Sequence, residues 1–355
     1  MNKFYIIVVF LCLFTFSALQ AQRMKRFGFA YRHGWVLKHH EELRQAFPGT
    51  HPFGVEFTYL SKTTGDEEWE RVWNYPDVGV NLVYLNYDDV RLGHVLISTF
   101  FLQKYIGDPD KRFQFSFKIA PGISYSSRAF DAETNPDNTF ISTRLNAIME
   151  GNLLAHYRLN PHLTLNGGFT FTHYSNGAIQ VPNSGFNIPT LTVGMIYSAN
   201  PANYNRNDEP ISPFHRRNRL QLKFAPSVKS FDDDNPKRYF AYTLSVNGIR
   251  YLNHKVGLNA AADLFYNASI PDRKKEPDAN KYRIGLAFGP ELTTGKNSLL
   301  FQLGYYVYRP VEIDKSWYWR IGIKHHFTDH LFIGFALKAH MGKADVIEWG
   351  TGYRF

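Results

Sequence analysis

A histidine and a serine two positions apart form the most reactive pair in the sequence. His173 and Ser175 end a run in which apolar and polar residues alternate, and Asn187 follows shortly afterwards. A serine with a histidine in reach, and a third group that orients the imidazole, is the general arrangement of an activated nucleophile. The alternative interpretation of the bare pair is a polar girdle at the end of a strand.

The residues that follow the pair offer hydrogen-bond donors. Asn176, Asn183 and the backbone amides of Gly177 and Ala178 could stabilise the oxyanion that forms when an ester carbonyl is attacked. A glycine at this point also lets the backbone approach a substrate that a side chain would block. We therefore expect these four residues to form the oxyanion and substrate-binding part of the site.

Side-chain parity predicts where the pair points. His173 and Ser175 share the parity of Phe169 and Phe171, and residues two apart on a strand lie on the same face. The apolar face of a membrane barrel points to lipid, so the pair is expected to project outward at the height of the outer leaflet. Asn187 has the matching parity on the next predicted strand. Polar groups on such a face are costly unless they have a function.

The elements that must position the site are strands. Sixteen alternating runs, each long enough to cross a bilayer as a tilted strand, predict an all-β, transmembrane antiparallel β-barrel of about sixteen strands, with fourteen also possible. Short turns follow the even-numbered runs and long polar loops follow the odd-numbered ones. Outer-membrane barrels have short periplasmic turns, so the odd-numbered strands are expected to run outward and both termini to be periplasmic.

One stretch departs from this turn pattern. Residues 199–215 are long, polar and rich in Pro and Asn, yet they follow an even-numbered run. They are compatible with a linker between two eight-stranded halves, because two small closed barrels also leave no free edge in lipid. We favour one barrel, since only the C-terminus carries an alternating last strand that ends in Phe355. That ending is what the barrel assembly machinery recognises, which makes the machinery an expected partner.

Composition and the N-terminus predict the compartment. Residues 1–21 have a positive start, an apolar run and small residues before Ala21, as in a secretory signal peptide, which leaves 22–355 as the outer-membrane barrel. Aromatic residues make up 16% of the chain, which suits interfacial girdles. The net charge of +9 comes from scattered residues, so it argues against nucleic acid and suits a phosphate-rich partner such as lipopolysaccharide.

The sequence resembles the PagL-type lipid A 3-O-deacylases of the outer membrane, and more closely their longer relatives, the acyloxyacyl hydrolases. The resemblance is carried by residues 173–176, by Pro182 and Asn183 with Gly185 after them, by 138–147, and by the ending 347–355. It implies Ser175 as the nucleophile and His173 as the general base. It also implies removal of an ester-linked 3-hydroxyacyl chain from lipid A in the outer leaflet.

The third member of the site departs from the family. The resemblance places a Glu where this chain has Asn187. An amide can orient the imidazole but adds no negative charge, and the equivalent change in a serine triad costs about 10⁴-fold, largely through the wrong tautomer. A loop carboxylate could substitute, and the candidates are Asp131, Glu133 and Asp137. Glu150 is a poor substitute, because its parity directs it into the lumen.

Other functions stay open at this stage. A non-enzymatic channel or structural barrel would not need Ser175, and an outer-membrane phospholipid esterase would use the same residues on a different lipid. Adjacent histidines such as His325 and His326 point to opposite faces of a strand, so no metal site and no cofactor are expected. Lipid A and other outer-membrane lipids are the expected partners, and a homodimer is an open alternative.

Overall fold

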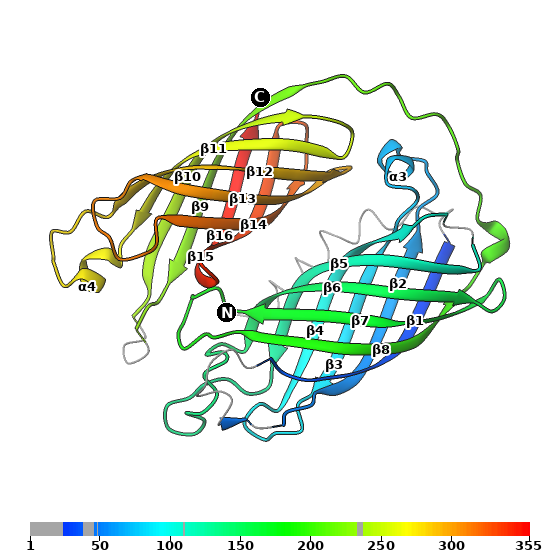
Figure 1. The fold of residues 1–355 in the computed structure, drawn as a ribbon, viewed down its shortest axis with the longest axis horizontal. Coiled ribbons are helices and arrows are strands. Elements are labelled where there is room, and N and C mark those ends of the chain that lie inside the picture. The colour runs from blue at the N-terminus through cyan, green and yellow to red at the C-terminus, as the bar shows by residue number, and fades with distance from the viewer. Residues whose placement is uncertain (1–23, 38–45, 48, 109–110, 233–236) are drawn as a thin grey trace. The chain divides into compact units, whose positions relative to one another are not determined.

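The computed structural model describes residues 24–37, 46–47, 49–108, 111–232 and 237–355. It contains sixteen antiparallel strands, as the sequence predicted, and they form two closed barrels of eight strands each (Figure 1). The expected signal peptide 1–21 lies outside the described residues. No helix among the described residues is long and apolar enough to cross a membrane.

The first barrel is built in sequence order. Its strands are β1 (Met24–Gly34), β2 (Phe53–Lys62), β3 (Asp77–Asn86), β4 (His94–Ile106), β5 (Phe113–Ser126), β6 (Leu145–Arg158), β7 (Leu163–Ser175) and β8 (Phe186–Ser198). It closes where β8 pairs with β1, in a register that runs from Arg26 opposite Ser198 to Gly34 opposite Thr190. A short helix, α3 (Glu68–Val72), lies between β2 and β3.

The second barrel follows the same plan. Its strands are β9 (Asn218–Lys229), β10 (Tyr239–Tyr251), β11 (Val256–Asn267), β12 (Tyr282–Thr294), β13 (Asn297–Tyr308), β14 (Trp317–His326), β15 (Leu331–His340) and β16 (Lys343–Arg354). It closes where β16 pairs with β9, from Thr351 opposite Phe224 to Arg354 opposite Gln221. The helix α4 (Ile270–Lys274) lies between β11 and β12.

The preference for one sixteen-stranded barrel is therefore wrong, and the alternative of two eight-stranded halves is confirmed. The stretch 199–215 is the connection between them, and it contains the short 3₁₀ helix η1 (Pro201–Asn203). The first part of this connection is hydrogen-bonded to the first barrel. Tyr75 donates a hydrogen bond of 2.6 Å to Asp208, and the Asn207 N–H donates one of 2.7 Å to the carbonyl of Thr64.

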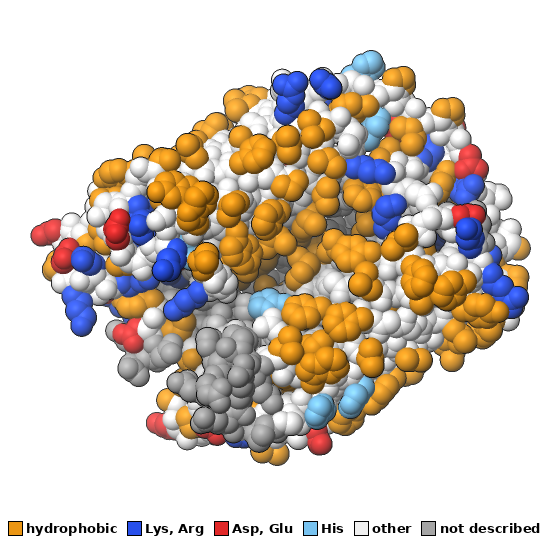
Figure 2. Space-filling model, viewed as in Figure 1, with side chains coloured by type: hydrophobic (Ala, Val, Ile, Leu, Met, Phe, Trp, Pro, Cys, Tyr) orange, Lys and Arg blue, Asp and Glu red, His pale blue; other side chains and the backbone are white. Residues whose placement is uncertain are grey.

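Contacts divide the chain into two units, each with one barrel. The first comprises Met1–Ser175 and Ser184–Pro210, and the second comprises Asn176–Asn183 and Ile211–Phe355. In both barrels the outward side chains are mostly apolar and exposed, and Figure 2 shows hydrophobic side chains spread over the visible surface. This is the pattern of a wall that faces lipid.

Side chains fill the interior of the first barrel. Arg32 is fully buried and bonds Glu150 at 2.7 Å and Glu56, while Lys118 lies 3.2 Å from Glu56. An eight-stranded barrel is just wide enough for its own side chains, whereas a sixteen-stranded one would enclose water. Long charged side chains at inward positions, which can pair across a narrow lumen, were the feature of the sequence that could have indicated two small barrels.

Candidate active site

The predicted site lies where β7 ends and β8 begins. Within this pair of strands His173 is directly opposite Asn187, and Tyr174 is opposite Phe186. His173 continues the outward row of Phe169 and Phe171, both of which are exposed, whereas Tyr174 points inward and is fully buried. The predicted parity of the histidine and of Asn187 is confirmed.

Asn187 orients the imidazole. Its Oδ1 lies 2.7 Å from His173 Nδ1. An amide oxygen can only accept a hydrogen bond, so this contact requires the proton on Nδ1 and leaves Nε2 as the basic nitrogen. The reversed amide would donate to Nδ1 and select the opposite tautomer, which is the state that inactivates a serine triad.

Gly185 brings the serine and the histidine to one place. A Cβ atom on Gly185 would lie 3.1 Å from His173 Cε1 and 3.3 Å from Ser175 Cβ, so both side chains border the same small space. Gly185 has a φ of +75°, a left-handed conformation that glycine adopts without strain. Ser175 itself is only 7% exposed. Ser175 is thus less open to lipid than its parity alone predicted.

The predicted oxyanion donors form a tight turn. The Ile179 N–H donates to the Asn176 carbonyl at 3.3 Å, and Gly177 and Ala178 between them have φ values of +63° and +67°. These angles define a type I′ turn. Ala178 holds a conformation that is uncommon for a residue with a side chain, and such strain is concentrated at functional sites.

Asn183 and Asn176 are tied to each other. The Asn176 N–H donates to Asn183 Oδ1 at 3.1 Å, and Asn176 Nδ2 donates to the Gln180 carbonyl at 2.8 Å. Asn176 therefore shapes the turn with both its backbone and its side chain. The other predicted oxyanion donors, Gly177, Ala178 and Asn183, lie in this turn or bond to it.

The loop carboxylates are engaged elsewhere. Asp131 accepts hydrogen bonds from the backbone and hydroxyl of Thr134 and from the backbone of Glu133 within its own loop, which lowers its pKa. Asp137 pairs with Arg91 at 3.1 Å. Glu133 is exposed on the same loop. Asn187, and not one of these acids, occupies the position beside the imidazole. Glu150 is buried in the lumen with Arg32, as its parity predicted.

Sequence reasoning missed the aromatic support beneath the site. The rings of Tyr174 and Phe186 stack at 4.8 Å, and Phe186 stacks on Phe140 at 4.2 Å. Phe140 belongs to the loop between β5 and β6, and its carbonyl accepts a 2.7 Å hydrogen bond from the Gly185 N–H. The only signal was the position of Phe140 inside residues 138–147, which carried part of the family resemblance.

The hydroxyl groups of Tyr87 and Tyr174 lie 2.5 Å apart at the same end of the lumen. Together with the aromatic stack and aliphatic side chains such as Leu85 and Ile188, they close this end of the first barrel with a hydrophobic cluster. Within the described residues, no group of three or more His, Asp or Glu side chains is placed to hold a metal ion.

Comparison with protein families gives two adjacent matches. Residues 53–196 match the model described as lipid A 3-O-deacylase (PagL), and residues 218–355 match the model described as acyloxyacyl hydrolase, C-terminal domain (PagL_C). No curated protein matches the chain. The first match covers β2 to β8 of the first barrel and the second covers all strands of the second barrel, so the boundary between the two models falls between the barrels.

Solved structures of outer-membrane proteins also match, at low similarity. Omp33 of Acinetobacter baumannii is 10% identical, with a TM-score of 0.18 and coverage of 95% of this chain and 99% of that one. The translocator domain of the autotransporter NalP from Neisseria meningitidis is 10% identical, with a TM-score of 0.21 and coverage of 99% and 97%. At these scores the likeness adds nothing to the fold described above.

The closed barrels, their apolar outer walls and the family matches define a β-barrel protein of the bacterial outer membrane. More particularly, the chain belongs to the lipid A 3-O-deacylase (PagL) family, in the branch that carries the acyloxyacyl hydrolase C-terminal domain. This family consists of hydrolases that deacylate lipid A.

Proposed function

We propose that the protein removes an ester-linked 3-hydroxyacyl chain from lipid A in the outer leaflet, with Ser175 as nucleophile and His173 as general base. The observation that carries the proposal is the 2.7 Å contact between His173 Nδ1 and Asn187 Oδ1, because it leaves Nε2 as the basic nitrogen that can accept the proton of Ser175. The space beside Gly185, which both His173 and Ser175 border, supports the same assignment.

The reaction runs in two halves. Ser175 Oγ attacks the ester carbonyl carbon while His173 Nε2 takes its proton, and the resulting imidazolium returns that proton to the departing sugar hydroxyl. This leaves the acyl chain on the serine. Water, deprotonated by His173, then attacks the acyl-enzyme. The bond between Ser175 Oγ and the acyl carbon breaks, the imidazolium returns its proton to Oγ, and the 3-hydroxy fatty acid is released. Neither half requires an oxidant or a reductant.

The oxyanion forms twice in this sequence. Its donors are the backbone amides of Gly177 and Ala178 and the NH₂ group of Asn183, while Asn176 holds the turn in shape. Fixed donors of this kind lose little entropy during the reaction, and removal of one typically costs about 10²–10³-fold in kcat.

The outer wall below the site suits an acyl chain. Phe169 and Phe171 on β7 and Leu191 and Val193 on β8 point outward and are exposed. A chain lying along these two strands would run from the headgroup level toward the middle of the membrane, which is the direction of lipid tails. Lipid A and the surrounding outer-membrane lipids are therefore the partners of this wall.

The test is the mass spectrum of lipid A from cells that express the wild-type chain, Ser175→Ala, or Ser98→Ala. Ser98 is a half-buried serine on β4, outside the site, and serves as the matched control. The proposal predicts loss of one 3-hydroxyacyl chain with the wild type and Ser98→Ala only. Identical spectra for all three would contradict it. If the purified protein released fatty acid from phospholipid but not from lipid A, the protein would be a phospholipid esterase.

The assembly of the protein is a separate expectation. The last strand, β16, ends next to Phe355, whose N–H donates a 2.9 Å hydrogen bond to the Leu220 carbonyl. We infer that the barrel assembly machinery recognises this ending. Deletion of Phe355 is then expected to lower the amount of protein in the outer membrane, and an unchanged amount would contradict this. Whether a homodimer forms is decided by the mass of the purified protein in detergent.

A further inference from the structure

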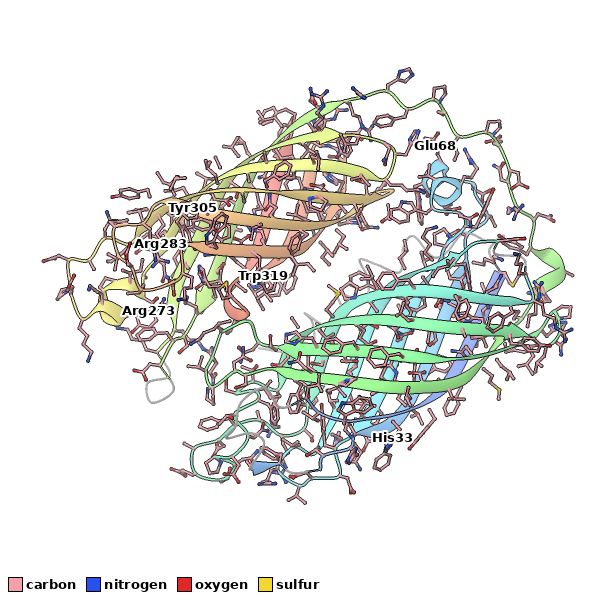
Figure 3. All side chains as sticks on the ribbon, viewed as in Figure 1. His33, Glu68, Arg273, Arg283, Tyr305 and Trp319 are labelled. Atoms are coloured by element: carbon pink, nitrogen blue, oxygen red, sulfur yellow. The ribbon has the colours of Figure 1, made fainter. Side chains whose placement is uncertain are left out.

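The second barrel holds a cluster of buried charges at the end where α4 lies, which is expected to face the outside of the cell. Arg283 and Arg273 both bond Asp314, each at 2.7 Å. Lys338 bonds Asp345 at 2.6 Å, and Lys229 bonds the same carboxylate. Figure 3 shows Arg273 and Arg283 at this end of the barrel.

Positive charge is in excess in this cluster. Four cationic side chains, all at most 18% exposed, share the two carboxylates of Asp314 and Asp345. The neighbouring carboxylates Asp272 and Glu312 are largely exposed and pair with cations of their own, Lys237 and Arg309. Among the described residues, the buried part of the cluster therefore carries more positive than negative charge.

The ion pairs deeper in the same barrel are balanced. Arg320 and Lys223 face Asp263 and Glu348, and Lys324 faces Glu291. The first barrel follows the same pattern, where Arg32 and Lys118 share Glu56 and Glu150 and Arg26 pairs with Asp77. Buried charges are normally compensated because an isolated one is costly. The α4 end of the second barrel departs from this pattern.

The same place has a cavity with unused donors. It has a volume of about 20 Å³ and is bordered by Ser227, Arg283 and Lys338 among others. The Nε atom of Arg283 and the hydroxyl of Ser227 are both buried and have no hydrogen-bond partner among the described residues. This volume is enough for one group the size of a water molecule or a single phosphate oxygen.

We propose that the α4 end of the second barrel is a binding site for a phosphate group. One phosphate oxygen enters the cavity and accepts hydrogen bonds from Arg283 Nε and Ser227 Oγ, while Lys338 and the half-buried Lys281 at the cavity edge supply charge. Guanidinium and ammonium groups are the side chains that bind phosphate most strongly. The bound phosphate supplies the negative charge that the cluster lacks.

Two ligands could provide this phosphate group: free phosphate, or the headgroup of a phosphorylated lipid in the outer leaflet. The inference does not depend on the proposed ester hydrolysis, because binding is measured without turnover. The test is equilibrium dialysis of the full chain in detergent against radiolabelled inorganic phosphate, at an ionic strength set with sodium gluconate. Saturable binding is expected for the wild type.

Two variants assign the binding to this site. Arg283→Gln is expected to weaken phosphate affinity by at least about tenfold, and Ser227→Ala by about two- to tenfold, since one hydrogen bond is lost. Ser124→Ala is the matched control, because Ser124 in the first barrel also has a buried hydroxyl without a partner among the described residues. It should bind as the wild type does.

A competition experiment separates the two sources. Displacement of the labelled phosphate by phosphorylated lipid A, but not by the same lipid A after removal of its phosphates, assigns the site to a lipid headgroup. Displacement by neither assigns it to free phosphate. Absence of saturable binding by the wild type would overturn the proposal, and so would equal affinity in the wild type and in a folded Arg283→Gln variant.

Discussion

His173 and Asn187 are directly opposite each other on β7 and β8, and the amide oxygen of Asn187 lies 2.7 Å from His173 Nδ1. A carboxylate beside a catalytic histidine orients the ring and stabilises the imidazolium, and the Asn187 contact provides only the first of these two effects. It fixes the tautomer and the ring orientation, but it adds no charge to stabilise the imidazolium. At position 187 this chain therefore keeps the group that orients the His173 ring but lacks the negative charge that would stabilise its protonated form.

Asn187→Glu is expected to raise kcat. A carboxylate at this position keeps the acceptor for Nδ1–H and adds the missing negative charge. Hydrogen bonds to charged groups are stronger than neutral ones by about 1 kcal/mol, which corresponds to roughly a fivefold increase in rate. Asn187→Leu should lower kcat by a larger factor, because nothing then orients the ring. Both are measured as release of 3-hydroxy fatty acid from lipid A, and a lower kcat for Asn187→Glu would contradict the role given to Asn187.

Gly185→Ala is expected to reduce activity far more than stability. The new methyl would lie 3.1 Å from His173 Cε1 and 3.3 Å from Ser175 Cβ, so at least one of the two must move. The left-handed φ adds a backbone cost of about 1–2 kcal/mol.

Gly107→Ala is the matched control for this variant. Gly107 has a φ of +83° and no described atom within 4 Å of its Cβ position, so it incurs the same backbone cost without the contacts. Equal activity in the two variants, after correction for the folded fraction, would show that Gly185 does not shape the site.

Phe140→Leu is expected to lower kcat although Phe140 is away from the reacting atoms. The ring stacks on Phe186, and its residue's carbonyl holds the Gly185 N–H. Phe47→Leu is the control, since Phe47 lies in the same cluster, 5.6 Å from Phe140, and loses a similar apolar area. Both should destabilise the first barrel by a similar amount, measured as the midpoint of thermal unfolding. Only Phe140→Leu should also lose activity, by about tenfold or more. An equal loss of activity in both variants would show that Phe140 only stabilises the barrel.

The purified protein is expected to show no steady ion conductance in a planar bilayer. The lumen of the first barrel is crossed by the Arg32–Glu150 ion pair and closed at the site end by the hydrophobic cluster, and Arg320 with Glu348 crosses the second lumen. Barrels of eight strands leave no aqueous channel when their side chains fill them. A steady, voltage-independent conductance would contradict this expectation and would support the alternative that the protein is a non-enzymatic channel.

The sequence predicted the local features well because they depend on alternation. The number of strands, the outward row through Phe169, Phe171 and His173, and the lumen position of Glu150 all follow from side-chain parity along one strand. The shared outward face of His173 and Asn187 followed from the same rule applied to two neighbouring strands, whereas their direct opposition is known only from the strand register.

Closure and long-range support could not be predicted in this way. Alternation along β8 does not tell whether it pairs with β1 or with β9, since either partner leaves the same faces exposed. The contact of Phe140 with Phe186 and Gly185 joins segments far apart in sequence, and no local pattern reports it. The low exposure of Ser175 has the same origin, because it depends on how the chain returns at Gly185.

The central claim is that Ser175 is a nucleophile activated by His173. The most direct measurement is peptide mapping by mass spectrometry after incubation of the purified protein with an alkyl fluorophosphonate, which phosphonylates activated serines. We expect one phosphonate adduct on Ser175 in the wild type, at least about a hundredfold slower labelling in His173→Ala, and no adduct in Ser175→Ala. An unlabelled Ser175 in the active wild type, or equal labelling rates with and without His173, would contradict it.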